Sequence, residues 1–447
     1  VHGGLRYLEH YEFNLVRKAL KEREVLLRAA PHIIWPMRFV LPVDKGMRPA
    51  WLLRLGLFLY DHLGGREILP ATSSVNLLKD RRGDTLQKRL RKGFAYSDCW
   101  VEDARLVSLT ARDAAERGAD IRTRTECIAL KRGADHWNLD IRQNGAVTTE
   151  QARVLVNAAG PWVDPVTAMY DQSGNAAKLR LVKGSHIVVK RKYEGDHSYI
   201  FQNRDGRIIF AIPYEGDYTL IGTTDQPWSY AEGPAEISDS EIDYLCDAAS
   251  EYFEKPVERT DIVWNDHSRT AATVTRDFVF DYDNDDGAPV LSIFGGKITT
   301  YRVLALQAIR TLSEALDVDG DDWTKEAHLP GGDFAPDDFD ALVDQYSSRW
   351  SFIDRSVLHR MVRAYGTDAA SILEDVQTVA DLGQEFGAGL YEIEILWLID
   401  REFACSADDV LWRRSKLGLH MNDADKRAVA LWFDQRSRKA KPEIDLS

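Results

Sequence analysis

The sequence predicts an α/β (α+β) fold that ends in a helical domain. Three observations predict it. Apolar strands that end in small residues and run into helical patterns occur at 154–164 and 290–316. Short β-branched runs separated by Gly, Asn and Asp fill residues 181–225. From Asp337 to Arg438 helical periodicity prevails, so the fold changes character near residue 330.

Size and composition narrow the function classes. The 447 residues are enough for two or three domains, and the net charge of −14 argues against a broad nucleic-acid surface, which needs a basic face. No C-x-x-C pair occurs, so a zinc site is not expected and we predict no metal. No apolar run reaches the ~20 residues of a membrane span. The cysteines are expected to be reduced thiols; they are Cys99, Cys127, Cys246 and Cys405.

The first hundred residues predict one helix and two unusual segments. Apolar residues at helical spacing predict a helix over 11–30, which Pro31 and Pro36 end. Residues 36–64 mix apolar, aromatic and arginine side chains. This composition suits a membrane interface, and the alternative is a buried helix whose arginines reach solvent. The charged residues 75–92 predict a solvated face or loop.

The middle of the chain predicts strands. We expect a turn at FAYSDCWVEDARL and then a helix within 94–116, and a strand within 118–130. Residues 136–162 predict a hairpin that turns at Asn144-Gly145 and leads into an apolar strand. Residues 181–225 predict an antiparallel sheet. Near the end, Ser406 and Asp409 have the spacing of a helix capping box.

Two strand ends predict ligand contacts. VLVNAAGPWVD ends in small residues, which allow backbone to approach a flat ligand at the carboxyl end of a parallel strand. FGGKITTYR predicts a second ligand contact of the same kind, because two glycines precede a helix start that carries partial positive charge. The lysine at this point adds a full positive charge. An ordinary strand–turn–helix with a surface lysine is the alternative. The candidate residues are Ala159, Gly160, Trp162, Gly295, Gly296, Lys297, Ile298 and Thr299.

The opening HGGLRYLEH gathers groups that suit an anionic substrate. Arg6 is a planar cation suited to a phosphate, and Tyr7 can donate a hydrogen bond. Gly3, Gly4 and Leu5 bring backbone near a flat ligand, and His2 is a candidate base. Farther on, His186 can take a proton near neutral pH and Thr224 can bind substrate oxygens, although ordinary core positions are the default for both types.

Taken together, these motifs resemble the respiratory, FAD-dependent glycerol-3-phosphate dehydrogenases. The run HGGLRYLEH, YSDCWVEDARL, NAAGPWV, KGSHIVV, IGTTD, DIVW, TRDFV, FGGKITTYR, LPGG and DDVLWRRSKLG follows the family order and spans almost the whole chain. The resemblance implies a glutathione-reductase-type FAD-binding domain (1–30, 94–175 and 286–320). It also implies an antiparallel-sheet substrate domain (31–93 and 176–285) and a helical domain (325–447).

The resemblance also implies the chemistry. It implies oxidation of sn-glycerol 3-phosphate to dihydroxyacetone phosphate, with FAD taking the hydride and a membrane quinone reoxidising it. The resemblance further implies a peripheral enzyme on the cytoplasmic face of the inner membrane, and it is compatible with a homodimer. Arg6, Tyr7, Thr224 and Arg276 would bind substrate, Lys297 would assist catalysis, and the base would be His2 or His186, between which the sequence does not choose.

Two departures from the family stand out. No G-x-G-x-x-G occurs, and the finger that carries it would precede Val1, so we expect a chain without that finger. The family's Ser-Gly-Val-Arg-Pro segment after DIVW is replaced by NDHSRTAATV, and Arg269 receives no role. The competing hypotheses are an oxygen-dependent glycerophosphate oxidase or related FAD oxidase, and a truncated remnant unable to hold FAD.

Overall fold

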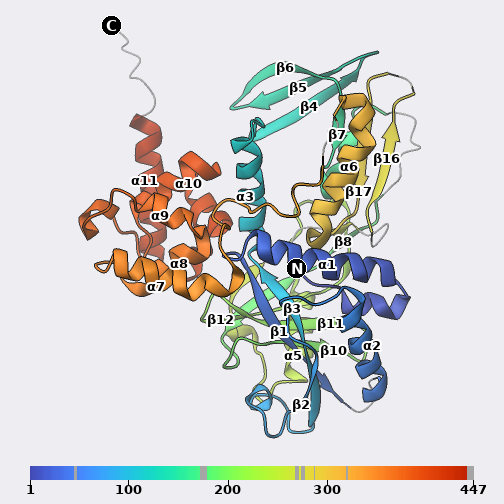
Figure 1. The fold of residues 1–447 in the computed structure, drawn as a ribbon, viewed down its shortest axis with the longest axis vertical. Coiled ribbons are helices and arrows are strands. Elements are labelled where there is room, and N and C mark those ends of the chain that lie inside the picture. The colour runs from blue at the N-terminus through green and yellow to red at the C-terminus, as the bar shows by residue number, and fades with distance from the viewer. Residues whose placement is uncertain are drawn as a thin grey trace. The chain divides into compact units, whose positions relative to one another are not determined.

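A computed structural model describes residues 1–44, 48–171, 179–266, 271–272, 277–285, 287–318 and 321–439. The chain divides into two compact units. Unit 1 comprises Val1–Glu24, Pro36–Cys99 and Arg124–Asp322, and unit 2 comprises Val25–Trp35, Trp100–Thr123 and Trp323–Ser447. Figure 1 shows their elements, and three of these (α1, β1 and β3) contribute residues to both units. The three-part domain division expected from the family stays a prediction.

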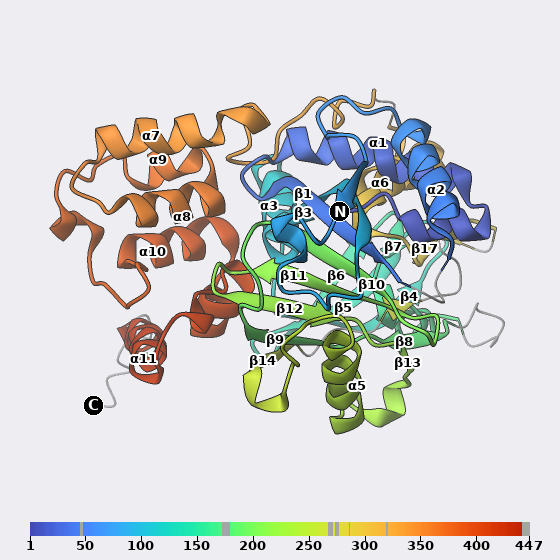
Figure 2. The same ribbon diagram turned by 90° about the horizontal axis from the view of Figure 1, so that it is seen from below.

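The largest sheet of unit 1 has the strand order β14-β9-β12-β11-β10-β1-β3-β2. Strands β9 to β12 pair antiparallel with one another, which confirms the antiparallel sheet predicted over 181–225, while β1 runs parallel to β10. Helix α5 covers one face, visible in Figure 2, and shares a buried core with the sheet. The bounds are β1 Ile34–Val43, β2 Ser73–Asn76, β3 Lys92–Val101, β9 His186–Lys190, β10 Ser198–Gln202, β11 Ile208–Tyr214, β12 Tyr218–Gly222, β14 Ile262–Asp266 and α5 Asp239–Ser250.

A second, small sheet has the order β16-β17-β7, and its strands β7 (Leu155–Asn157) and β17 (Val290–Phe294) run parallel. Their carboxyl ends therefore lie at one edge. Strand β17 continues through a short 3₁₀ helix, η6 (Ile298–Thr300), into α6 (Tyr301–Leu316), as the sequence predicts. The third strand is β16 (Val279–Asp283), and α4 (Val163–Thr167) comes after β7 in the chain. A separate antiparallel sheet has the order β13-β8-β15, with the bounds β8 Leu181–Lys183, β13 Gln226–Pro227 and β15 Ala271–Ala272.

The predicted hairpin is confirmed as part of the sheet β4-β5-β6 (Thr125–Arg132, Trp137–Gln143 and Ala146–Ala152). Asn144 and Gly145 both have positive φ, 51° and 83°, as a two-residue turn between right-twisted strands requires. The helix predicted over 11–30 is α1 (Phe13–Ala29).

Two sequence interpretations need correction. The segment FAYSDCWVEDARL is not a turn, because strand β3 spans Lys92–Val101 and helix α3 (Asp103–Glu116) follows it directly. The polar residues Ser97 and Asp98 do not interrupt the strand, since the half-buried Arg38 bonds to Ser97 and the buried Arg23 bonds to Asp98. Residues 36–64 are not one segment: β1 is followed by α2 (Ala50–Leu63), and α2 is not a buried helix, as only Leu57 and Tyr60 are buried.

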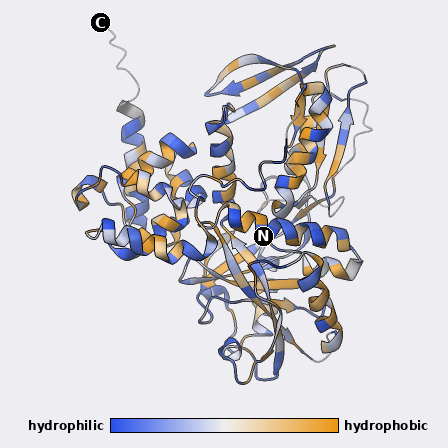
Figure 3. Cartoon of the chain, in the orientation of Figure 1, coloured by the Kyte–Doolittle hydropathy of each residue, from blue (hydrophilic) through white to orange (hydrophobic). Residues whose placement is uncertain are grey.

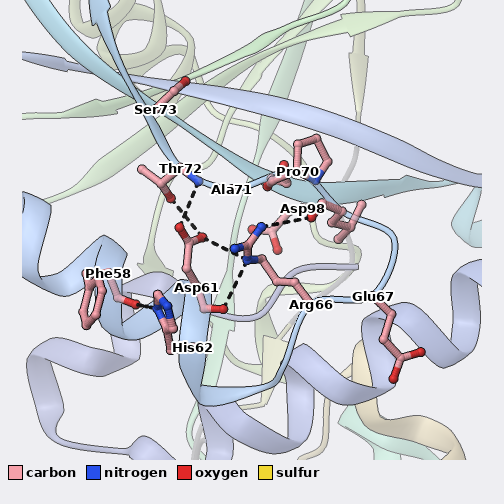
Figure 4. A network of polar contacts seen from close by, with 12 residues as sticks. Phe58, Asp61, His62, Arg66, Glu67, Pro70, Ala71, Thr72, Ser73 and Asp98 are labelled. Atoms are coloured by element: carbon pink, nitrogen blue, oxygen red, sulfur yellow. Dashed lines mark hydrogen bonds and ion pairs between the residues drawn. The ribbon is translucent and has the colours of Figure 1, made fainter.

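Helix α2 keeps an apolar face in solvent. Its exposed residues include Trp51 at 69%, Leu55 at 49% and Phe58 at 56%, and apolar residues predominate along it in Figure 3. The loop after α2 is fixed by Asp61, whose carboxylate accepts hydrogen bonds from the backbone N–H (2.9 Å) and hydroxyl (3.0 Å) of Thr72, shown in Figure 4. Among the described residues no helix is long and apolar enough to cross a bilayer.

Unit 2 is helical, as predicted, and packs around one apolar core. Its compact unit also takes in α3, and Arg105 on α3 forms a buried ion pair with Glu402 on α10. The Ser406–Asp409 pair is bonded as expected, since Ser406 Oγ lies 2.9 Å from the Asp409 carboxylate, and a short π-helix spans Asp409–Arg414. The helices are α7 Phe339–Arg349, α8 Arg355–Tyr365, α9 Asp368–Ile372, α10 Glu392–Glu402 and α11 Asp423–Lys439.

Candidate functional site

The carboxyl edge of the β7–β17 pair carries the two predicted glycine-containing turns. After β7, the side-chain oxygen of Asn157 accepts from the backbone N–H of Ala159 and its amide donates to Val163 O at 2.9 Å, which fixes the turn. Gly160 has a φ of 57°, and a Cβ there would meet no atom within 4 Å. Ligands of open α/β sheets bind outside such strand ends, and open space at Gly160 agrees with this.

The second turn brings a lysine to the same edge. Gly295 and Gly296 have φ values of 74° and 101°, which side-chain-bearing residues rarely adopt. Lys297 follows, and its Nζ lies 3.5 Å from the centre of the Tyr7 ring. A cation over an aromatic face is attracted by the ring quadrupole. The lysine is half-buried against the amino-terminal segment, so it is not the solvated surface lysine of the alternative interpretation.

The amino-terminal segment is held beside the start of α6. The backbone N–H of His2 lies 3.3 Å from Thr299 Oγ1, so residues 297 positions apart are in contact. Arg302 on α6 donates from Nε and Nη2 to the two carboxylate oxygens of Glu22 on α1 (2.9 and 2.7 Å), and this buried pair joins the two helices. The structure thus brings together His2, Tyr7, Lys297 and Thr299 from the two ends of unit 1.

The two opening glycines have packing reasons of their own. A Cβ at Gly3 would lie 2.3 Å from Leu20 Cδ2 and 2.5 Å from the Tyr60 hydroxyl, so these two side chains exclude any larger residue. Gly4 has a φ of 76° and begins a 3₁₀ helix, η1 (Leu5–His10). The side chain of Arg6, and all of Arg269 and Arg276, lie outside the described residues.

His2 is a neutral imidazole at neutral pH. Its surface is exposed in part, but the protein packed around it lowers its pKa to about 4, and the positive charges of Lys297 and Arg23 act in the same direction. The Asp98 carboxylate opposes them. A neutral imidazole can accept a proton, which a base must do.

The second group of predicted residues lies where β9 and β12 pair. Gly222 stands opposite His186, and a Cβ on Gly222 would lie 2.1 Å from the imidazole Cδ2. Thr224 is only 2% exposed and its hydroxyl donates to Glu241 Oε1 at 2.7 Å. The predicted contact between Thr224 and substrate therefore requires this hydroxyl to change partner or to share its lone pairs.

Two buried carboxylates that the sequence analysis did not single out organise these groups. Glu241 accepts from Thr224 and Ser185 and pairs with Lys183 Nζ at 2.8 Å, and its spacing from Ser238 is that of a capping box, a signal present in the sequence. Asp98 lies within YSDCW and accepts from the backbone N–H of Gly3 at 3.0 Å. Nothing local marks Asp98, because its partners are far away in the chain.

Comparison with known proteins identifies the family. Residues 1–300 match the profile "FAD dependent oxidoreductase", and residues 323–434 match "C-terminal domain of alpha-glycerophosphate oxidase". The chain belongs to the FAD-dependent glycerol-3-phosphate dehydrogenase family.

Three curated relatives are similar over nearly the whole chain. A D-erythritol 1-phosphate dehydrogenase of Brucella abortus is 46% identical, with 97% of this chain and 89% of the relative covered. A glycerol-3-phosphate dehydrogenase of Pseudomonas aeruginosa is 45% identical (95% and 85%). The aerobic glycerol-3-phosphate dehydrogenase of Escherichia coli is 42% identical (97% and 88%).

The solved structure of a Bacillus halodurans glycerol-3-phosphate dehydrogenase complexed with FAD shares the fold. It has a TM-score of 0.73 at 22% identity, with 96% of this chain and 87% of that chain covered. FAD is the cofactor of this family. The residues at the strand edge fit a flavin, because Gly160 faces open space and Lys297, which follows the neighbouring parallel strand β17, supplies positive charge at the same edge. The described residues hold no group of three or more potential metal ligands.

Glu241→Gln is expected to loosen the loops that carry Thr224 and Ser185. The folded protein lowers the pKa of Glu241 to about 2, against the opposing effect of burial, through bonds from Lys183, Ser238 and Thr224. The ionised carboxylate therefore stabilises the fold above its ordinary pKa of about 4.5, and this contribution is lost as pH falls toward 2. At pH 7 the variant should lose about 2 kcal/mol in the free energy of unfolding.

Urea unfolding at several pH values measures this loss, and the difference between wild type and variant should shrink below pH 4.5. Glu126→Gln is the matched control, because its ion pair with Arg142 is largely exposed. A difference that stays constant from pH 7 to pH 3 would contradict the assignment.

Proposed function

We propose that the protein oxidises sn-glycerol 3-phosphate to dihydroxyacetone phosphate and passes the electrons to a membrane quinone. The observation that supports this most is the contact of the His2 and Tyr7 segment with Lys297 and Thr299 at the carboxyl edge of β7 and β17. Base, hydrogen-bond donor and cation meet there. Similarity to two glycerol-3-phosphate dehydrogenases at 42–45% identity supports the substrate.

Each predicted residue has a role in this proposal. Arg6 and Arg276, with Lys297, bind the substrate phosphate, because planar and point cations complement its charge. Tyr7 and Thr224 orient the substrate oxygens. FAD, when bound, supplies the hydride acceptor, and Gly3, Gly4, Leu5, Ala159, Gly160, Trp162, Gly295, Gly296, Ile298 and Thr299 line its place.

A histidine takes the proton from the C2 hydroxyl while the C2 hydrogen leaves as hydride, so that C2 becomes a carbonyl carbon. Two histidines are candidates, His2 and His186. The tether of His2 to Thr299 supports His2, since it fixes this residue beside Lys297. The low pKa of His2 keeps it in the unprotonated form that a base requires.

A four-carbon substrate is the second candidate. The relative of Brucella abortus is a D-erythritol 1-phosphate dehydrogenase and is 46% identical, as similar to this chain as the glycerol-3-phosphate enzymes are. Both substrates carry a secondary alcohol and a phosphate monoester, so the same cation and base serve either. They differ in the length of chain beyond the reacting carbon.

Oxygen is the second candidate for the acceptor. The carboxy-terminal residues match a domain described from alpha-glycerophosphate oxidase, and the fold of a Mycoplasma pneumoniae glycerophosphate oxidase is similar (TM-score 0.55, 14% identity, 71% of this chain and 83% of that chain). Oxidases of this kind would release peroxide instead of reducing a quinone.

We further propose that the protein docks peripherally on the cytoplasmic face of the inner membrane through α2, as the quinone acceptor requires. Trp51, Leu55 and Phe58 form an exposed apolar stripe at helical spacing, and Arg48 and Arg54 are exposed beside it. Such a basic amphipathic helix suits a lipid interface with anionic headgroups. A homodimer stays a prediction.

The test of the activity uses the purified chain with added FAD. Bound flavin is expected to give a yellow protein whose absorbance bleaches on addition of sn-glycerol 3-phosphate, and a quinone analogue should restore the absorbance without peroxide. Faster bleaching by D-erythritol 1-phosphate would favour the second substrate, and peroxide in place of quinone reduction would favour the oxidase. A colourless chain that never takes up FAD would contradict the proposal and favour the remnant.

His2→Asn is expected to lower turnover by about 10²–10⁴-fold with little change in FAD binding, because a positioned base is typically worth that factor. Measuring kcat for His2→Asn and His186→Asn in parallel separates the two candidates. Arg6→Ala serves as the contrast, since loss of a phosphate contact should mainly raise KM. Full turnover in His2→Asn would remove this residue as the base.

Replacing Trp51 and Phe58 by Gln is expected to reduce partitioning into vesicles of anionic phospholipid at least ~10-fold, because each aromatic side chain loses an apolar contact of roughly 1.5–3 kcal/mol at full burial. Sedimentation with the vesicles measures it. The control is Val147→Gln with Leu431→Gln, which removes exposed apolar groups from β6 and α11. Equal partitioning of both variants would disprove docking through α2.

A further inference from the structure

The motif YSDCW has no role in the function proposed above, although its aspartate is one of the most enclosed carboxylates of unit 1. Asp98 is 2% exposed on strand β3. Its neighbours come from three other parts of the unit, the amino-terminal segment, α1 and α2. A carboxylate in such a place is costly unless hydrogen bonds and an opposite charge compensate it.

Every described contact of the Asp98 carboxylate comes from a donor. The backbone N–H of Gly3 lies 3.0 Å from Oδ1, and Arg23 Nη1 lies 2.6 Å from the same oxygen. The Tyr60 hydroxyl lies 2.8 Å from Oδ1 and 2.9 Å from Oδ2. The described contacts thus supply donors to both oxygens, and Arg23 is the counter-charge of the carboxylate.

The same donors define the space around Gly3. Tyr60 Oη and Leu20 occupy the place where a Cβ at Gly3 would stand. On the next strand residue, the backbone N–H of Cys99 donates to Val1 O at 3.1 Å, so residues 1–3 run beside β3. On the other side, His2 N bonds to Thr299 Oγ1. The segment is thus held from β3 and from the start of α6 at once.

We propose that Asp98 is a positioning residue for the reaction: it fixes Gly3, and through Gly3 it sets where His2 stands relative to Thr299 and Lys297. Tyr60 orients the Asp98 carboxylate, because its hydroxyl bonds to both carboxylate oxygens and so determines the direction in which Oδ1 faces Gly3. This inference rests on the proposed function for its catalytic part, but the tether itself is independent of it.

Tyr60→Phe is the test variant, because it removes the hydroxyl and leaves the Asp98–Arg23 ion pair in place. Hydrogen–deuterium exchange of the peptide covering residues 1–8, measured without FAD, should accelerate about 10-fold, as expected for the loss of one hydrogen bond to a charged group. With FAD, kcat should fall about 10-fold while KM for glycerol 3-phosphate stays unchanged. A folded Asp98→Asn variant should show still faster exchange of residues 1–8 and a still lower kcat than Tyr60→Phe.

The matched control is Tyr96→Phe. Tyr96 is a buried tyrosine of β3 whose ring packs at 5.8 Å from that of Tyr60, but its hydroxyl is not among the described donors to Asp98. It should change exchange and kcat less than twofold. Unchanged exchange of residues 1–8 in Tyr60→Phe would overturn the tether, and faster exchange with unchanged kcat would overturn the catalytic part. An inactive wild type would refute the proposed function, whereas the exchange result would still decide the tether.

Discussion

The enclosed carboxylate of Asp98 is the constraint on which the arrangement of unit 1 depends. It binds groups that the chain supplies at positions 3, 23, 60 and 98, and an ionised group removed from water tolerates no missing partner. The amino-terminal segment, α1, α2 and β3 are therefore fixed together. Since α1 is also joined to α6 by the Glu22–Arg302 pair, the two halves of the candidate site share one framework.

The sequence predicts the parts of the fold whose signals are local. The Asn144-Gly145 turn needs positive φ at two successive residues, and few residue pairs adopt it readily. These two residues are therefore enough to predict the hairpin. The passage from β17 through Gly295-Gly296 into α6 is likewise marked by an apolar run, two glycines and a change of period. The helical end of the chain follows from periodicity alone.

What the sequence leaves open depends on partners far away in the chain. The segment that forms β3 contains the polar residues Ser97 and Asp98. Their partners include Arg23 and Arg38, which lie more than 50 residues away in the chain and help to make the two residues suitable for a buried strand. The glycine at position 3 also has a packing reason that the sequence does not show, because Leu20 and Tyr60 occupy the space that a side chain would need. Thr224 similarly has the right residue type for binding substrate, yet its hydroxyl is bonded to Glu241.

Local charge explains how an acidic protein presents a suitable site for an anion. The net charge of −14 is spread over the whole chain, and screening over roughly 8 Å at physiological ionic strength reduces the effect of distant carboxylates. Near His2 the local charges differ from this average: Asp98 is paired with Arg23, and the ammonium group of Lys297 lies over the Tyr7 ring. The protein packed around His2 is the main cause of its low pKa, and the positive charges of Lys297 and Arg23 act in the same direction. Lys297, which the proposal places at the phosphate, therefore also helps to keep the imidazole unprotonated. Asp98 limits this effect, because its negative charge raises the pKa that Lys297 and Arg23 lower, and the position of one buried carboxylate thereby links the geometry of the segment to its protonation.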